Sequence, residues 1–185
     1  QNPARGRWFG LIVPRFEEGL WENSQYVLDK QMAETEGVPG LPLLIQTIRE
    51  KLRPRKLNII AHSMGAWLVL QALEKHAAEI LPIDRLIFLA PDVPANAFSN
   101  AALRTAAAQI GSVHVYHSRL DDILALTEIG WKEMSMGRLG PYKKEALHAN
   151  IKVHNVTEAL GKENVHGKYL KENGAEAIAL TEALR

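Results

Sequence analysis

The chemistry most clearly indicated by this sequence centres on Ser63, in the pentapeptide AHSMG at residues 61–65. This stretch differs by one residue, an alanine for the first glycine, from Gly-x-Ser-x-Gly, the pattern of a sharp strand-to-helix turn that exposes a nucleophilic serine. Such a turn favours small residues two positions before and after the serine, where the chain approaches itself closely. An apolar β-branched run precedes the serine and an apolar helical run follows it. We therefore predict that Ser63 is a nucleophile; the alternative is a serine that only caps a helix.

A serine nucleophile needs a histidine that removes its proton and a carboxylate that orients the histidine. In sheets with this turn the partners follow in the order serine, acid, histidine, each beyond a strand end. Asp121 comes soon after the predicted strand at 112–117 and is the preferred acid. Two alternatives stay open: Asp122, which is also suited to capping the next helix, and Asp92, beyond the predicted strand at 85–90.

The preferred base is His166, one of seven histidines. It combines a predicted loop, a neighbouring glycine and a position after the last predicted strand. Five of the other histidines have different expected places: His114 and His154 in strands, His76 in the helix after the serine, His148 in an unassigned segment, and His62 beside the serine but pointing away from it.

An oxyanion formed at the serine would need hydrogen-bond donors from the backbone. The N–H of Met64 is the first expected donor, because it lies at the start of the predicted helix. The second would come from Arg15 or Phe16, which follow the one strand predicted upstream of the serine.

The hydrophobic pattern alternates short apolar runs with longer amphipathic ones, which is typical of strands and helices in a parallel sheet. We expect a three-layer, doubly wound and mostly parallel α/β sheet in a single domain over residues 1–185. The expected strands are 8–13, 57–61, 85–90, 112–117 and 151–156. The expected helices are 41–52, 64–79, parts of 95–110, parts of 122–133, and 175–184.

Residues 128–150 are the longest stretch without an assigned element. The favoured interpretation is a helix extension and a surface loop whose apolar residues patch the core. The alternative is a small lid-like insertion, with Trp131, Met134 and Met136 lining a pocket for an acyl group.

Composition excludes several other classes of protein. The chain has 185 residues, no cysteine and a net charge of +1, so thiolate zinc sites and a large positive field for nucleic acid are not expected. The sequence contains no HExxH motif and no glycine-rich phosphate loop, and no apolar run long enough to span a membrane. No metal or organic cofactor is expected. The first residue is Gln1, so we expect a processed chain or a piece of a longer one; the cytoplasm is slightly favoured as its location, and the oligomeric state is not indicated.

The four stretches that carry these residues, NIIAHSMGAWLVLQAL, LIFLAPDVPANAF, VYHSRLDDILAL and VHGKYL, resemble in that order the α/β-hydrolase superfamily. Within it they are similar to a bacterial family known only as a domain of unknown function. The resemblance spans residues 41–170 and implies a compact α/β-hydrolase fold with Ser63 as nucleophile, Asp121 as acid, His166 as base and Asp92 in a structural role. That family usually has a His-Gly pair after an earlier strand, on the other side of the oxyanion hole, and this chain lacks it there.

Together these features predict a serine hydrolase that cleaves an ester or related acyl bond of a small molecule through an acyl-enzyme. One alternative is a non-catalytic binding protein on the same fold, which the missing His-Gly pair favours. Another is an acyltransferase or thioesterase, which uses the same residues.

Overall fold

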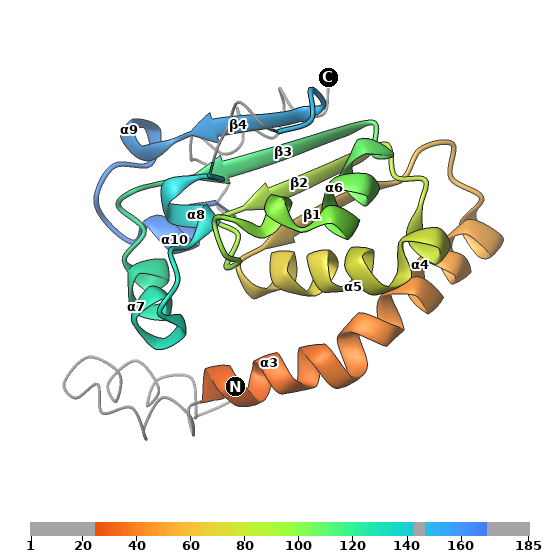
Figure 1. Cartoon of the computed structure of the whole chain (residues 1–185), viewed down its shortest axis with the longest axis horizontal. Helices are drawn as coiled ribbons and strands as arrows, with labels where there is room; N and C mark the ends of the chain where they lie inside the picture. The colour runs from red at the N-terminus through yellow and green to blue at the C-terminus, as the bar shows by residue number, and fades with distance from the viewer. Residues whose placement is uncertain (1–24, 143–146, 170–185) are drawn as a thin grey trace.

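The computed structural model describes residues 25–142 and 147–169. In this part of the chain a sheet of four parallel strands lies between layers of helices (Figure 1). The strands stand side by side in sequence order: β1 (Asn58–His62), β2 (Arg85–Leu89), β3 (Ser112–His117) and β4 (Ile151–Asn155). Because all four run in the same direction, their carboxyl ends meet at one edge, where ligands of such sheets bind.

The alternation of side chains along β2 explains the three layers. Leu86 and Phe88 belong to the larger core cluster, together with residues of α5 (Met64–Ile80) and α6 (Ala101–Ala108). Ile87 and Leu89 belong to a second cluster on the opposite face. Successive residues of a strand point to opposite faces, so a strand that is apolar throughout must be covered on both sides.

The second face is covered by shorter helices that follow β3 and β4. Three helices of the described chain contribute residues to this cluster: α7 (Asp122–Trp131) contributes Leu124, α9 (Thr157–Leu160) contributes Leu160, and α10 (Val165–Lys168) contributes Val165. Each of these residues is at most 3% exposed. The short helix α10 is therefore anchored to the sheet by apolar burial, since an isolated helix of four residues is not stable.

A long helical segment precedes the sheet and packs along α5 (Figure 1). It consists of α3 (Gln25–Met32), a π-helical turn η1 (Ala33–Gly37) and α4 (Val38–Leu52). The sequence predicted only its last part, 41–52. In α3 only Tyr26 is buried, so this part of the helix has no wide apolar stripe from which periodicity could predict it.

The other predicted elements agree with the structure to within a few residues where the structure describes them. The predicted strand at 8–13 and the predicted helix at 175–184 lie outside the described residues. The range 95–110 contains a short 3₁₀ turn, η2 (Ala97–Ser99), before α6.

The segment at 128–150 contains the end of α7 and the short helix α8 (Met136–Leu139). Its described part is fixed by backbone hydrogen bonds to the loop after β2, including Met136 N–H to the carbonyl of Val93 at 2.8 Å. A Cβ added to Gly137 would lie 2.5 Å from the carbonyl carbon of Ala90, so only glycine allows this approach. Such packing agrees with the core-patching interpretation; a lid-like role stays a prediction.

Candidate active site

The carboxyl ends of the strands bring together the polar residues that the sequence singled out. Ser63 follows β1, Asp92 lies three residues beyond β2, Asp121 lies four residues beyond β3, and His166 is in α10 after β4. His166 is thus on a short helix rather than in the predicted loop. The connection from β4 to α10 is long enough to bring its ring back over the end of β1.

The backbone of Ser63 has φ 54° and ψ −126°, a conformation that residues other than glycine rarely adopt. Such a conformation costs about 1–3 kcal/mol, and hydrogen bonds hold it in place. The N–H of Ser63 donates to the carbonyl of Leu89 (3.0 Å), and its own carbonyl accepts from the N–H groups of Ala66 (3.0 Å) and Asp92 (3.2 Å). Within the described part of the chain the Ser63 hydroxyl makes no capping bond to α5, which removes the capping alternative.

The expectation about small flanking residues is met on one side only. Ala61 is 6% exposed and part of the core. A Cβ added to Gly65 would have no described atom within 4 Å. The close approach that the motif predicts at Gly65 is therefore absent from the described part of the chain.

The imidazole of His166 lies between the serine hydroxyl and the Asp121 carboxylate. Its Nε2 is 2.9 Å from Oγ of Ser63, and its Nδ1 is 2.9 Å and 3.1 Å from the two carboxylate oxygens of Asp121. The side chain of Asp121 is 0% exposed and that of His166 is 13% exposed. With Nδ1–H bonded to the carboxylate, Nε2 is left without a proton and accepts from the hydroxyl. This arrangement can move a proton from the hydroxyl to the imidazole.

Of the three candidate acids, Asp121 is the one that bonds to His166. The same carboxylate caps α7 by accepting a hydrogen bond from the N–H of Leu124 at 3.0 Å, so its position is set by the helix as well as by the histidine. Asp122 is not the cap but the exposed first residue of that helix.

Asp92 has different partners. It is 7% exposed, and it accepts hydrogen bonds from the hydroxyl of Tyr26 and, at 2.9 Å, from the hydroxyl of Thr127. Burial raises the pKa of Asp92, and these two hydrogen bonds oppose the rise. Its contacts join α3 and α7 to the end of β2, which agrees with a structural role.

His62 does not point away from the site, as was expected from its position beside the serine. Its ring centroid is 4.7 Å from that of His166, and its Nε2 is 3.0 Å from the backbone carbonyl oxygen of His166. Burial, followed by the proximity of His166, lowers the pKa of His62. Sequence reasoning missed this contact, because the turn at Ser63 redirects the chain and the alternation of a regular strand does not apply there.

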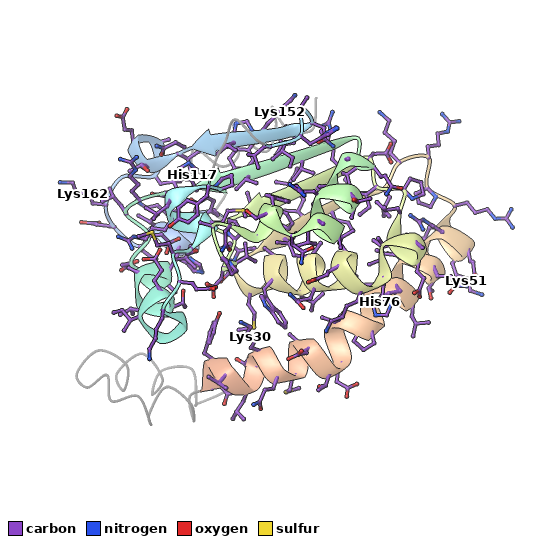
Figure 2. All side chains as sticks on the ribbon, in the orientation of Figure 1. Lys30, Lys51, His76, His117, Lys152 and Lys162 are labelled. Carbon is purple, nitrogen blue, oxygen red and sulfur yellow. The ribbon has the colours of Figure 1, made fainter. Side chains whose placement is uncertain are left out.

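Other histidines of the described chain lie in β3, β4 and α5. His114 and His154 bond to each other across β3 and β4 at 3.1 Å. Figure 2 shows His117 at the carboxyl end of β3 and His76 toward the far end of α5. The described residues contain no cluster of three or more side chains suited to a metal ion.

The predicted oxyanion donors are only partly within the described chain. Met64 is the first residue of α5, where a backbone N–H has no carbonyl to bond one turn earlier in the helix. Arg15 and Phe16 lie outside the described residues.

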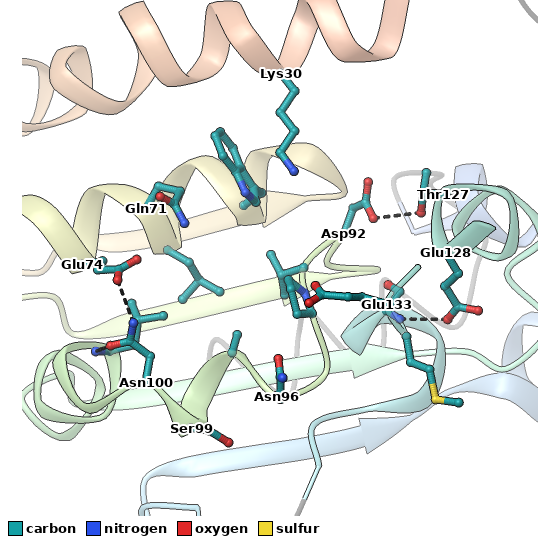
Figure 3. Close-up of a pocket in the computed structure, with 18 residues that line it drawn as sticks. Lys30, Gln71, Glu74, Asp92, Asn96, Ser99, Asn100, Thr127, Glu128 and Glu133 are labelled. Atoms are coloured by element: carbon teal, nitrogen blue, oxygen red, sulfur yellow. Dashed lines mark hydrogen bonds between the residues drawn. The ribbon is translucent and has the colours of Figure 1, made fainter. Parts of the chain in front are cut away.

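A cavity of about 380 Å³ opens one helical turn beyond Ser63 along α5 (Figure 3). Trp67 lines one wall, Asp92 lies at the end nearest β2, and Lys30 reaches in from α3 with its ammonium 4.7 Å from the Trp67 ring centre. Burial lowers the pKa of Lys30 to about 8, an effect that the charge of Asp92 opposes. Ser63 is not among the described residues that line this cavity.

The three residues predicted to line an acyl pocket are in different places. Met134 is 52% exposed and lines the same cavity as Trp67. Met136 is 0% exposed in the core, so it does not line a pocket; the tight packing of α8 against the loop after β2 buries it. The side chain of Trp131 lies outside the described part.

Within the described residues, no helix is both long and apolar enough to span a bilayer.

Comparison with known protein families gives one finding. A family model described as "Alpha/beta hydrolase of unknown function (DUF900)" matches residues 2–182. Neither the curated proteins nor the solved structures contain a match. The match covers nearly the whole chain and includes every residue of the hydrogen-bonded site.

Proposed function

The chain belongs to the alpha/beta hydrolases of unknown function, and from this premise we propose that it is a serine hydrolase that cleaves an ester or related acyl bond. The observation that carries the proposal is the hydrogen-bonded series Ser63, His166 and Asp121, with distances of 2.9 Å on both sides of the imidazole. Family membership alone supports a hydrolase fold, and fold does not determine the reaction. The geometry of these three side chains is what favours acyl transfer.

In the proposed reaction Oγ of Ser63 attacks the substrate carbonyl while Nε2 of His166 takes the hydroxyl proton. The resulting imidazolium is stabilised by the buried carboxylate of Asp121. His166 then donates this proton to the leaving alcohol as the bond between acyl carbon and alcohol oxygen breaks. A water molecule, deprotonated by His166, attacks the acyl-serine and releases the carboxylic acid, and the proton returns to Oγ.

The negative oxygen of the tetrahedral intermediate needs donors that are already oriented. The N–H of Met64 is suited to donate to this oxygen, because it is the first backbone N–H of a 17-residue helix whose positive end faces the site. Arg15 or Phe16 as the second donor stays a prediction.

The proposal is tested by labelling the protein with a fluorophosphonate probe, which reacts with activated serines. We expect stoichiometric labelling of the wild type and none of Ser63→Ala. Replacing His166 with alanine should slow labelling by at least ~10³-fold, because the base is lost. Ser99→Ala is the matched control, since Ser99 is an exposed serine beside the cavity, and it should label like the wild type.

A folded wild-type protein that resists the probe would support the non-catalytic binding protein instead. If labelling occurs, p-nitrophenyl esters of increasing acyl length would define the substrate class. Adding an alcohol or thiol acceptor at millimolar concentration during turnover would distinguish hydrolysis from acyl transfer: an acyltransferase should form mainly the new ester or thioester, whereas a hydrolase should still release mainly the carboxylic acid, because water attacks most of its acyl-enzyme.

A further inference from the structure

His62 occupies a position that the proposed reaction does not yet use. It is the last residue of β1 and directly precedes Ser63. Its ring faces two aromatic side chains near α10, with centroids 4.7 Å from His166 and 6.2 Å from Tyr169. His62 therefore joins the strand that carries the nucleophile to the helix that carries the base.

The hydrogen bond between the two histidines has a defined direction. A backbone carbonyl oxygen can only accept, so Nε2 of His62 must carry a proton and donate it to the carbonyl of His166, 3.0 Å away. A neutral His62 is then the Nε2–H tautomer. The bond is made to the backbone of His166 and leaves both ring nitrogens of that residue for Ser63 and Asp121.

We propose that His62 is a positioning residue, which holds the backbone of His166 so that its imidazole stays between Ser63 and Asp121. This inference rests on the proposed serine hydrolase function. Because His62 and Ser63 are consecutive, the backbone carbonyl and the ring of His166 are bonded to neighbouring residues at the end of β1. The bonds to Ser63 and Asp121 hold the ring of His166, and the bond from His62 holds its backbone. Without the bond from His62 the backbone could shift and carry the ring away from Ser63.

The position of α10 shows why such a bond is needed. This helix has only four residues, so its own hydrogen bonds cannot fix its location. Val165 and Tyr169 anchor it by burial at 0% and 1% exposure, which is not directional, and the ammonium of Lys168 donates to the carbonyl of Leu160 at 2.6 Å, two residues away from His166. The bond from His62 is directional and acts on His166 itself, the residue whose position the proposed reaction depends on.

The charge of His62 is also compatible with this role. Burial lowers the pKa of His62, which keeps the ring neutral while the neighbouring imidazole takes up a proton during the reaction. A permanent cation at this position would repel the imidazolium of His166 and slow proton transfer.

The test compares His62→Gln, which retains an N–H donor at about the position of Nε2, with His62→Phe, which retains a ring and loses the donor. His76→Phe is the control, since it makes the same change near the far end of α5. Two readouts are measured on each variant: the low-field proton NMR signal of the proton between His166 and Asp121, and the rate of labelling by the fluorophosphonate probe. Thermal unfolding checks that the variants are folded.

We expect His62→Phe to lose or broaden the NMR signal and to label about 10–100-fold more slowly than the wild type. The glutamine variant should keep the signal and label within about threefold, and His76→Phe should match the wild type. A merely structural role would affect the glutamine and phenylalanine variants alike, in proportion to their loss of stability.

The inference is overturned if folded His62→Phe keeps both the signal and the labelling rate, or if glutamine fails to rescue either readout. The NMR signal does not require a reaction. A wild type that shows the signal but never labels, with the signal lost in His62→Phe and kept in His62→Gln, would refute the hydrolase proposal and leave the positioning role supported.

Discussion

Replacing Asp121 with asparagine should separate the stability of this protein from its reactivity. The carboxylate accepts from Nδ1 of His166 at 2.9 Å and from the N–H of Leu124 at 3.0 Å. An asparagine oxygen can still accept the second bond, and asparagine caps helices as well as aspartate does. We therefore expect the free energy of unfolding of Asp121→Asn to differ from that of the wild type by less than about 1 kcal/mol. This figure includes the loss of a favourable negative charge at the start of α7.

The distance between His166 and Asp121 also limits how much reactivity the substitution can remove. At an effective dielectric constant of about 20, opposite unit charges 2.9 Å apart attract by about 6 kcal/mol. Removing this attraction raises the energy of the imidazolium that forms in the transition state, which sets a ceiling of roughly 10⁴-fold on this effect. The asparagine amide can also donate to Nδ1 and so leave the proton on Nε2, where it blocks the base. We expect labelling by the fluorophosphonate probe to slow by about 10³–10⁴-fold.

The assay measures the second-order rate of labelling beside unfolding in urea. Asp122→Asn is the matched control, because Asp122 is the adjacent, exposed aspartate and should leave the rate within about twofold. If Asp121→Asn labels within tenfold of the wild type while Ser63→Ala is inert, then the carboxylate does not support the base and the reasoning is wrong.

Three further changes test two packing contacts and the titration of a buried histidine. Gly137→Ala should lower the free energy of unfolding in urea by about 2–4 kcal/mol, because the added Cβ would lie 2.5 Å from backbone and side-chain carbons. Gly40→Ala is the control: a Cβ there would have no described atom within 4 Å, so this variant should be neutral or slightly stabilising. Equal effects of the two substitutions would contradict the packing argument. Tyr26→Phe removes a hydrogen-bond donor to the buried carboxylate of Asp92 and should lower the free energy of unfolding by about 1–3 kcal/mol. The loss should be smaller when Asp92→Asn is already present. Additive losses in this double-mutant cycle would show that the two residues do not interact. Burial lowers the pKa of His114 to about 4, so the unfolded chain takes up this proton before the folded one as the pH drops. The free energy of unfolding should therefore fall between about pH 6.5 and 4, by at most about 3.4 kcal/mol and, after screening, by about 1–2 kcal/mol. In urea unfolding at several pH values, this free energy should depend less steeply on pH in His114→Phe than in the wild type, and equal dependence would refute the assignment.

The sequence predicted the described strands because their signal is local. Ile59, Phe88 and Val115 lie in short β-branched or aromatic runs bounded by polar or turn residues, which is sufficient to predict strands that are covered on both faces. The first part of the long helix, at Gln25–Met32, carried no such signal. It buries only Tyr26, and its contacts with distant parts of the chain include the hydrogen bond from Tyr26 to Asp92 and the contact of Lys30 with the Trp67 ring.

The candidate site was predicted in outline from the order of its residues. Ser63 follows a strand in a recognisable turn, and parallel strands must bring their carboxyl ends to one edge. Therefore Asp121 and His166 could be expected near it, and the structure has them in hydrogen-bonding contact. Their catalytic roles stay predictions until the labelling experiments are done.

The parallel sheet, the turn at Ser63 and the order of the polar residues along its edge could thus be predicted, because each follows from patterns of neighbouring residues in the chain. That Asp121 rather than Asp122 or Asp92 bonds to the imidazole, and that His62 turns toward His166, is seen first in the folded arrangement. These outcomes depend on the direction of single side chains and on distances of about 3 Å between residues that are up to 104 positions apart. Packing sets those distances, and no local pattern in the chain encodes them.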